Sequence, residues 1–131
     1  MRFVGVLLST LTLVAAASAA VVKATLTGST HRPVVGKPWT WTLVVEDGSG
    51  KALPAKAKLQ ITVAGMVVGC WKAGKMQPCH GATAGTTISF VGKKTGVIRW
   101  TAESKGVPLT FRALVTAGGK TTKLRYAVTV R

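Results

Sequence analysis

Acidic side chains are almost missing from this 131-residue sequence, which has only Glu46, Asp47 and Glu103. Glu46 and Asp47 are neighbours in a turn-like EDGSGK stretch, and Glu103 is far from them in sequence. Acid–base catalysis by carboxylates needs two acids that converge in one pocket. The sequence offers no such pair.

Cysteine and histidine are also scarce, with two residues of each. There is no C-x-x-C redox spacing and no G-x-S-x-G nucleophile motif. A nucleophile needs a base within hydrogen-bond reach. His80 directly follows Cys79, whose thiol a disulfide would consume, and His31 lies in a predicted loop before Arg32-Pro33. We therefore predict a protein that is not an enzyme and carries no cofactor.

Basic residues dominate the charge, because 18 lysines and arginines face three acids and leave a formal net charge of +15. A charge so strongly of one sign attracts polyanions. It indicates an anionic partner, although a solvated surface that aids solubility is the simpler alternative.

The N-terminus has the pattern of a secretory signal peptide. Arg2 is followed by an apolar run over residues 3–16 and by the small-residue site Ala17-Ser18-Ala19. The run is short for a membrane anchor, which needs about 20 apolar residues, and no cysteine lies at the cleavage site to accept a lipid. We predict a signal peptide over 1–19 and one domain over 20–131 that acts in the periplasm, in the cell wall or outside the cell; an uncleaved anchor is the alternative.

Two cysteines nine positions apart in an exported chain predict one disulfide, Cys70–Cys79. The segment CWKAGKMQPC between them shows no apolar periodicity and is expected to be a stapled loop. Soft metal ligands over residues 66–80 indicate copper binding as an alternative role for this loop, and redox chemistry is a further alternative. These ligands are Met66, Cys70, Met76, Cys79 and His80.

Apolar and polar residues alternate with a period of two, which is typical of half-buried β-strands, and no segment has a convincing helical pattern. The strong runs are 38–46, 58–63, 98–103, 109–116 and 123–130, and weaker ones are 22–27, 67–71 and 86–91. One-sided alternation favours antiparallel sheets with one wet face. We predict an all-β, two-sheet sandwich of seven or eight strands, with a closed barrel as the alternative.

Gly118-Gly119 predicts a two-residue hairpin, because both glycines tolerate the positive φ that such turns require. With Ala117 opposite Lys120, Phe111 faces Tyr126 on the apolar side. On the outer side the same register places Arg112 opposite Arg125 and Leu114 opposite Lys123. Two like charges face each other there, which is destabilising unless they splay into water or share an anion.

The stretches VGKPWTWTLVVEDGSGKAL and PLTFRALVTAGGKTTKLRYAVTVR, behind an exported N-terminus, resemble bacterial secreted immunoglobulin-like domains. The resemblance implies an immunoglobulin-like sandwich, an extracytoplasmic location and a binding or structural role. Cys70 and Cys79 are too close in sequence for the inter-sheet disulfide of antibody domains. The resemblance transfers no functional residue.

The tryptophans are expected to pack rather than to bind. Trp39, Trp41 and Trp100 lie on the apolar faces of predicted strands. Trp71 is expected to pack on the disulfide, and stacking on a sugar or a base is its alternative role.

The candidate site is an anion-binding face of Arg112 and Arg125, whose guanidinium forks suit phosphate or carboxylate, flanked by Lys123. Other outward or turn positions add basic residues: Lys56, Lys58, Lys72, Lys75, Lys93, Lys94, Arg99 and Arg131. We predict a secreted binding module for anionic cell-envelope polymers or membrane surfaces, and a structural or protein–protein interaction domain is the alternative. The sequence contains no recognised nucleic-acid motif, which argues against sequence-specific binding of DNA or RNA.

Overall fold

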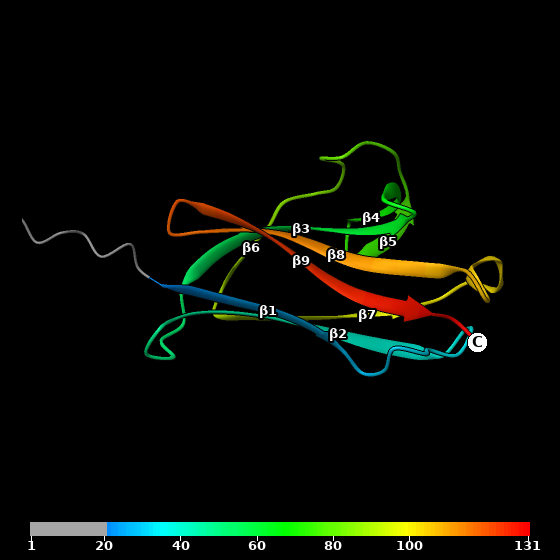
Figure 1. Cartoon of the computed structure of the whole chain (residues 1–131), viewed down its shortest axis with the longest axis horizontal. Helices are drawn as coiled ribbons and strands as arrows, with labels where there is room; N and C mark the ends of the chain where they lie inside the picture. The colour runs from blue at the N-terminus through cyan, green and yellow to red at the C-terminus, as the bar shows by residue number, and fades with distance from the viewer. Residues whose placement is uncertain (1–20) are drawn as a thin grey trace, which may run out of the picture.

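The computed structural model describes residues 21–131, so the predicted signal peptide over 1–19 lies outside the described residues. Nine strands and one 3₁₀ turn follow one another along the chain (Figure 1). They are β1 (Val22–Gly28), β2 (Pro38–Asp47), β3 (Pro54–Val63), β4 (Met66–Lys72), β5 (Lys75–Pro78), β6 (Ile88–Val91), β7 (Lys93–Arg99), η1 (Ala102–Ser104), β8 (Pro108–Ala117) and β9 (Lys120–Thr129). The predicted all-β class is confirmed.

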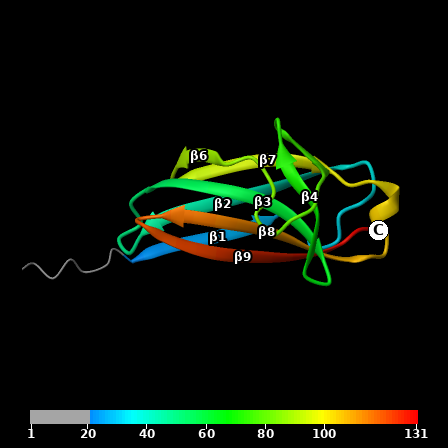
Figure 2. The same cartoon turned by 90° about the horizontal axis from the view of Figure 1, so that it is seen from above.

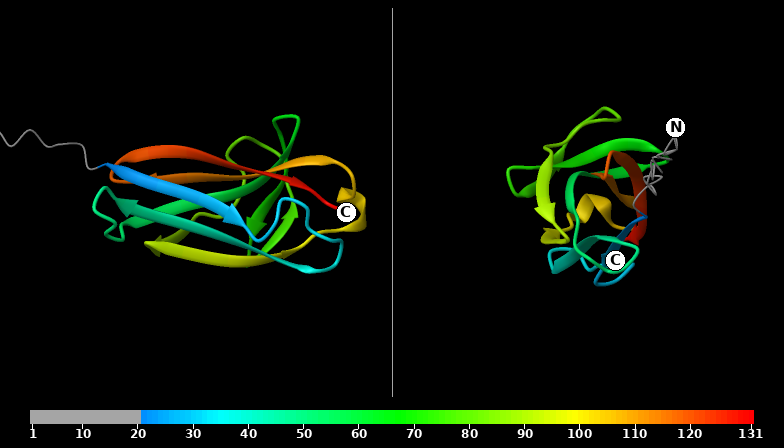
Figure 3. Two further views of the ribbon diagram at one scale, coloured as in Figure 1. Left: turned by 60° about the horizontal axis from the view of Figure 1, so that its bottom comes forward. Right: turned by 90° about the vertical axis from the view of Figure 1, so that its left-hand side faces the viewer.

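The strands form two antiparallel sheets that lie as two layers in Figure 1 and are seen end-on in Figure 3. The smaller sheet has the order β1-β2-β7. The larger has the order β5-β4-β3-β8-β9, and β6 pairs with the first half of β3. The predicted sandwich is therefore correct. Among the described residues, no helix is long and apolar enough to cross a membrane.

The core between the sheets is built from the alternating residues that the pattern indicated. Trp39 and Trp41 of β2 are almost fully buried, as is Phe111 of β8. The Trp39 ring meets the rings of Trp100 and Phe111 edge to face, with centroids 5.4 Å apart in each pair. The predicted packing role of Trp39, Trp41 and Trp100 is thus confirmed.

The β8–β9 hairpin has the predicted register. Ala117 pairs with Lys120 around Gly118 and Gly119, whose φ angles are 56° and 74°. Phe111 is opposite Tyr126, and Arg112 is opposite Arg125. Because a one-residue slip would exchange the two faces, this register decides that Arg112 lies on the outer face of the larger sheet.

The strand predicted over 98–103 is wrong at both ends. β7 ends at Arg99, and Ala102–Ser104 forms the 3₁₀ turn. The alternation continued past the strand because Trp100 is buried from an irregular segment, so the pattern reported burial rather than an extended backbone. Lys93 and Lys94, predicted in a turn, are instead the first residues of β7 and pair with β2.

The segment between the cysteines is not an irregular loop. It contains the end of β4, a tight turn and β5, which pairs back onto β4. The turn is formed by Ala73 and Gly74, with φ of 51° and 76°, and alanine at positive φ gives no recognisable turn signal in the sequence. A register shift at Ile61/Thr62 accompanies the inclination of β4 to β3 in Figure 2.

Candidate anion-binding site

Residues 79–87, here called the covering loop, lie over the outer face of the larger sheet. The predicted disulfide joins Cys70 of β4 to Cys79 at the start of this loop, with Cα atoms 5.8 Å apart. Gln60 Nε2 donates hydrogen bonds to the carbonyl oxygens of Ala82 and Ala84 at 3.0 and 2.8 Å. One covalent bond and these hydrogen bonds therefore hold the loop against β3 and β4.

Arg112 is buried beneath the covering loop. The sequence places it on the outer face opposite Arg125, where we expected the two side chains either to splay into water or to share an anion, but only 8% of its surface is exposed. Its Nε and Nη2 donate to Gln60 Oε1 at 2.9 and 2.5 Å. Gln60 is fully buried, so its amide links the arginine to the covering loop.

The charge of Arg112 has no ionic partner within residues 21–131. A buried charge is costly unless it is paired and hydrogen-bonded, and no salt bridge forms among residues 21–131. Two of the five N–H donors of the guanidinium reach the neutral Gln60 amide. The remaining donors have no protein acceptor among the described residues.

A hollow of about 460 Å³ lies beside the guanidinium. We call it the Arg112 hollow. Its lining consists of Gly65, Met66, Val67, His80, Gly81, Ala82, Arg112 and Lys123. Two of the three predicted site residues thus meet there, and Arg125 does not, although it is opposite Arg112 in the register and exposed.

His80 is a residue of this hollow that sequence reasoning did not assign to it. From the sequence alone, His80 is a candidate metal ligand or catalytic base. Its position directly after Cys79 was the available signal, because the disulfide holds the start of the covering loop to β4. Lys123 comes from β9 and His80 from the covering loop, so the hollow is enclosed from two sides by cationic or hydrogen-bonding side chains.

The alternative ligands for copper do not converge as a set, although Met66 and His80 both line the Arg112 hollow. Cys70 and Cys79 are joined to each other. Met66 is 71% exposed and lines the Arg112 hollow, whereas Met76 packs against the core between the sheets. The predicted packing of Trp71 on the disulfide is wrong, because its ring is buried in the core between the sheets, where it meets Trp41 edge to face with centroids 5.6 Å apart.

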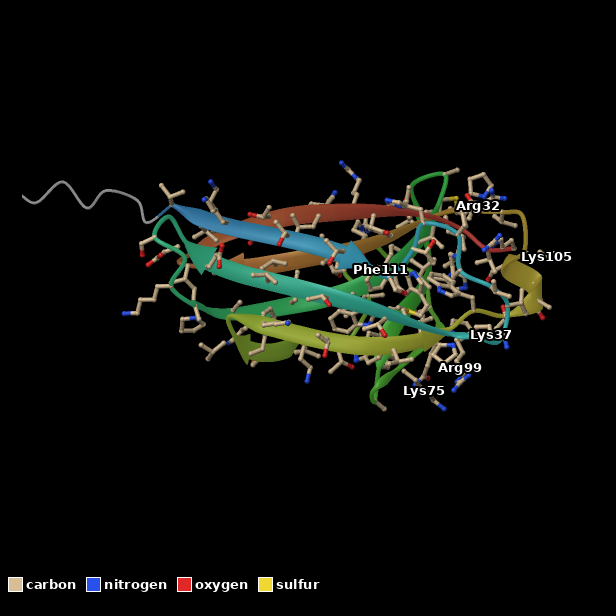
Figure 4. All side chains as sticks on the ribbon, turned by 90° about the horizontal axis from the view of Figure 1, so that it is seen from below. Arg32, Lys37, Lys75, Arg99, Lys105 and Phe111 are labelled. Carbon is tan, nitrogen blue, oxygen red and sulfur yellow. A yellow bond between two sulfur atoms is a disulfide. The ribbon has the colours of Figure 1, made fainter. Side chains whose placement is uncertain are left out.

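A second basic region lies at the end of the sandwich where the chain terminates. Figure 4 shows Arg32, Lys37, Lys75, Arg99 and Lys105 around this end. All five are exposed, and Arg99 Nη1 donates to the Gly36 carbonyl oxygen at 2.9 Å. These side chains create a positive end without a buried charge, unlike the Arg112 hollow.

Comparisons with known proteins give structural likeness only. No family model matches the chain, and no curated protein matches it. A CARDB domain from Pyrococcus furiosus, solved in complex with di-metal ions, is 12% identical, with coverage of 86% of this chain and 89% of that one and a TM-score of 0.49. The sporulation control protein Spo0M of Bacillus subtilis is 12% identical, with coverage of 86% and 50% and a TM-score of 0.47. A DUF4466 family protein from Parabacteroides merdae is 16% identical, with coverage of 83% and 45% and a TM-score of 0.43.

Proposed function

We propose that this chain is a non-enzymatic, immunoglobulin-like binding module that holds anionic polymers of the cell envelope. The observation that carries the proposal is the buried, positively charged Arg112 beside a hollow, with a neutral amide as its partner. A phosphate or carboxylate group in the Arg112 hollow would supply the missing negative charge.

The chemistry of the hollow suits such a group. Arginine presents a planar fork of donors that matches phosphate or carboxylate oxygens, and lysine adds a mobile point charge. Gln60 fixes the guanidinium from one side, so little side-chain freedom remains to be lost on binding. Polymer units outside the hollow would meet the excess of exposed basic residues, including Arg125.

The disulfide is compatible with a location in the cell envelope, which the proposed function requires. A disulfide persists in oxidising environments such as the periplasm or the outside of the cell. Attraction between a basic protein and a repeating polyanion is long-ranged and weakens with salt. The proposed module would therefore reside on its polymer at moderate ionic strength and would leave it at high ionic strength.

Retention on isolated phosphate-rich wall polymer across a salt titration tests the proposal. The wild-type protein is expected to be released between about 0.1 and 0.5 M salt. Lys123→Gln removes an exposed charge that lines the hollow, and Lys120→Gln is its matched control, because Lys120 is exposed on the same strand outside the hollow.

The salt concentrations at which the two variants are released decide between a specific site and diffuse charge. Earlier release of Lys123→Gln than of Lys120→Gln supports the Arg112 hollow as the site. Equal release of both variants overturns the site and leaves diffuse charge as the cause of retention. No retention at low salt overturns the polyanion function in favour of the protein–protein interaction domain.

A further inference from the structure

A second hollow lies on the outer face of the larger sheet, beside the Arg112 hollow. We call it the Lys58 hollow, and its volume is about 200 Å³. It is lined by Lys56, Ala57, Lys58, Thr83, Thr87, Leu114, Thr116 and Thr121. The covering loop, which extends above the larger sheet from β4 toward β6 in Figure 1, contributes to both hollows, as do β8 and β9. The two hollows are therefore built from the same three elements.

The strand register places the two hollows end to end. Leu114 of β8 lines the Lys58 hollow and is directly opposite Lys123 of β9, which lines the Arg112 hollow. Side chains opposite each other in a sheet have Cβ atoms about 4.5–5.5 Å apart. In the covering loop, Ala82 lines one hollow and its neighbour Thr83 lines the other. The two hollows are thus adjoining parts of one groove along β8 and β9, which we call the outer groove.

The outer groove is basic throughout. Arg112 and Lys123 line one end of it, and Lys56 and Lys58 line the other. The three acidic residues of the sequence belong to β2 and the 3₁₀ turn, and none lines either hollow. A groove whose charges all have one sign attracts an ion of the opposite sign along its whole length.

The donors of the outer groove can be reached from solvent. All four threonines of the Lys58 hollow are exposed, as are Lys56 and Lys123. Among residues 21–131, the fully enclosed side-chain donors without a partner are the indole nitrogens of Trp41 and Trp100. Arg112 Nη1 also has no partner but is not enclosed in this way, so it is open to the hollow.

Each end of the outer groove combines a fixed cation with a mobile one. Lys58 is half-buried, and its Nζ donates to the Thr83 carbonyl oxygen at 2.9 Å. This bond uses one of the three N–H donors of the ammonium group and leaves two for a ligand. Lys58 is thus held by the covering loop as Arg112 is held by Gln60, and the exposed Lys56 accompanies it as Lys123 accompanies Arg112.

We propose that the two hollows are consecutive subsites for one linear chain of phosphate groups, an inference that rests on the proposed function and names the class of polymer. Arg112 and Thr116 are four residues apart on β8, so the outer groove is about 13 Å long. A single phosphate or a lipid headgroup would fill one subsite. A chain with two or more phosphates within this length would fill both.

The arrangement of donors in the Lys58 hollow favours phosphate over carboxylate. Ammonium groups come from β3, and hydroxyl groups come from β8, β9 and the covering loop. A tetrahedral phosphate presents acceptor oxygens in several directions, whereas a carboxylate presents two oxygens in one plane. Donors that surround a group from several sides therefore match phosphate better.

Calorimetric titration with inorganic diphosphate and with a linear polyphosphate of about ten units, at about 0.15 M salt, tests this proposal. The long chain is expected to bind at least about tenfold more tightly, because its second contact forms at a high effective concentration. In ¹H–¹⁵N NMR spectra, diphosphate should shift the amide resonances of the Arg112 hollow. The long chain should also shift those of the four threonines of the Lys58 hollow.

Variants separate a second subsite from diffuse attraction. Thr121→Phe fills the Lys58 hollow without a change of charge and should weaken binding of the long chain about fivefold, while binding of diphosphate stays constant. Thr129→Phe is the matched control, because Thr129 is exposed on the same strand outside both hollows. Lys56→Gln should weaken binding of the long chain about threefold. Its control is Lys93→Gln, an exposed lysine of the smaller sheet, which should have a smaller effect.

Three results would overturn the second subsite. These are equal affinities for diphosphate and the long chain, equal effects of Thr121→Phe and Thr129→Phe, and long-chain NMR shifts confined to the Arg112 hollow. Equally tight binding of a polygalacturonate of similar length would overturn phosphate as the class of polymer. After any of these results, weaker diphosphate binding by Lys123→Gln than by Lys120→Gln would still support the Arg112 hollow. Equal diphosphate binding by these two variants would overturn the Arg112 hollow itself.

Discussion

Phe111 and Arg112 are neighbours on β8 and both are buried, yet they are buried in different ways. Phe111 points between the sheets, where its ring meets Trp39 and Trp41. Arg112 points to the opposite face, where Gln60 and the covering loop enclose it. One strand thus carries an apolar layer on one face and a polar layer on the other.

The difference shows two routes to burial. The apolar layer excludes water by close packing of large side chains, which stabilises in proportion to the area buried. The polar layer removes charged and amide groups from water, and each must find a partner inside. The first layer therefore accounts for most of the stability of the fold, and the second holds a charged group beside an open hollow.

The largest predicted effect comes from the apolar layer. Phe111→Ala is expected to lower the free energy of unfolding by about 3–5 kcal/mol, because a fully buried aromatic ring leaves a cavity. Arg112→Met should change it by less than half of that, since Met retains volume and removes a buried charge. Unfolding in guanidinium chloride measures both. A larger loss for Arg112→Met would contradict the assignment of stability to the apolar layer.

Removal of the disulfide should loosen the covering loop more than the core. The Cys70→Ser/Cys79→Ser variant is expected to lose about 2–3 kcal/mol of unfolding free energy, through the freedom regained by a short loop in the unfolded chain. Amide hydrogen exchange in β2 and β8 should accelerate only as far as this lower global stability requires, and exchange within 79–87 should accelerate more. An equal acceleration in 79–87 and in β2 would show that the two layers do not open independently.

Variants of Gln60 and Arg112 test whether the hydrogen bonds between these two side chains stabilise the polar layer. Gln60→Ala leaves the guanidinium without its acceptor and the loop without its clamp, and should lower the free energy of unfolding by about 1–3 kcal/mol. Gln60→Leu combined with Arg112→Met replaces both partners by apolar groups and should restore most of that loss. Additive losses in the double variant would refute the coupling.

The smallest effect concerns the half-buried side chain of Asp47 at the end of β2. Hydrogen bonds from Ser49 Oγ and from the backbone N–H groups of Lys51 and Ser49 lower the pKa of the Asp47 carboxyl. A lowered pKa in the folded state adds stability above the unfolded pKa of about 4, and that stability is lost as the pH falls through the folded value. The difference in unfolding free energy between wild type and Asp47→Ala should therefore shrink between pH 5 and pH 2. A difference that stayed constant with pH would show that ionisation of the Asp47 carboxyl does not cause the difference in unfolding free energy.

The residues of the apolar layer could be predicted from the sequence. Period-two alternation located the inward residues of β2 and β8, and the two glycines at 118 and 119 set the register that pairs Phe111 with Tyr126. Both signals are local, since each depends on neighbours along one or two strands. They failed at Trp100, where burial continued after the strand had ended.

The polar layer could be predicted only in part. The register placed Arg112 and Lys123 on the correct face, but the burial of Arg112 depends on the covering loop, 25 or more residues away in sequence. That loop has no periodicity, and the side chains of Gln60 and Lys58 donate to its backbone carbonyl oxygens, which every residue possesses. Pairing of this kind leaves no pattern in the sequence of the loop itself.

Those carbonyl contacts have a consequence for how this chain can change over evolution. Gln60 and Lys58 hold the covering loop at Ala82, Thr83 and Ala84 through main-chain oxygens alone. Ala84 must stay small because it packs on the disulfide, but the exposed side chains of Ala82 and Thr83 take no part in the attachment. Mutations at these two positions can therefore accumulate without detaching the loop, and descendants of this domain can acquire new ligands on an unchanged scaffold.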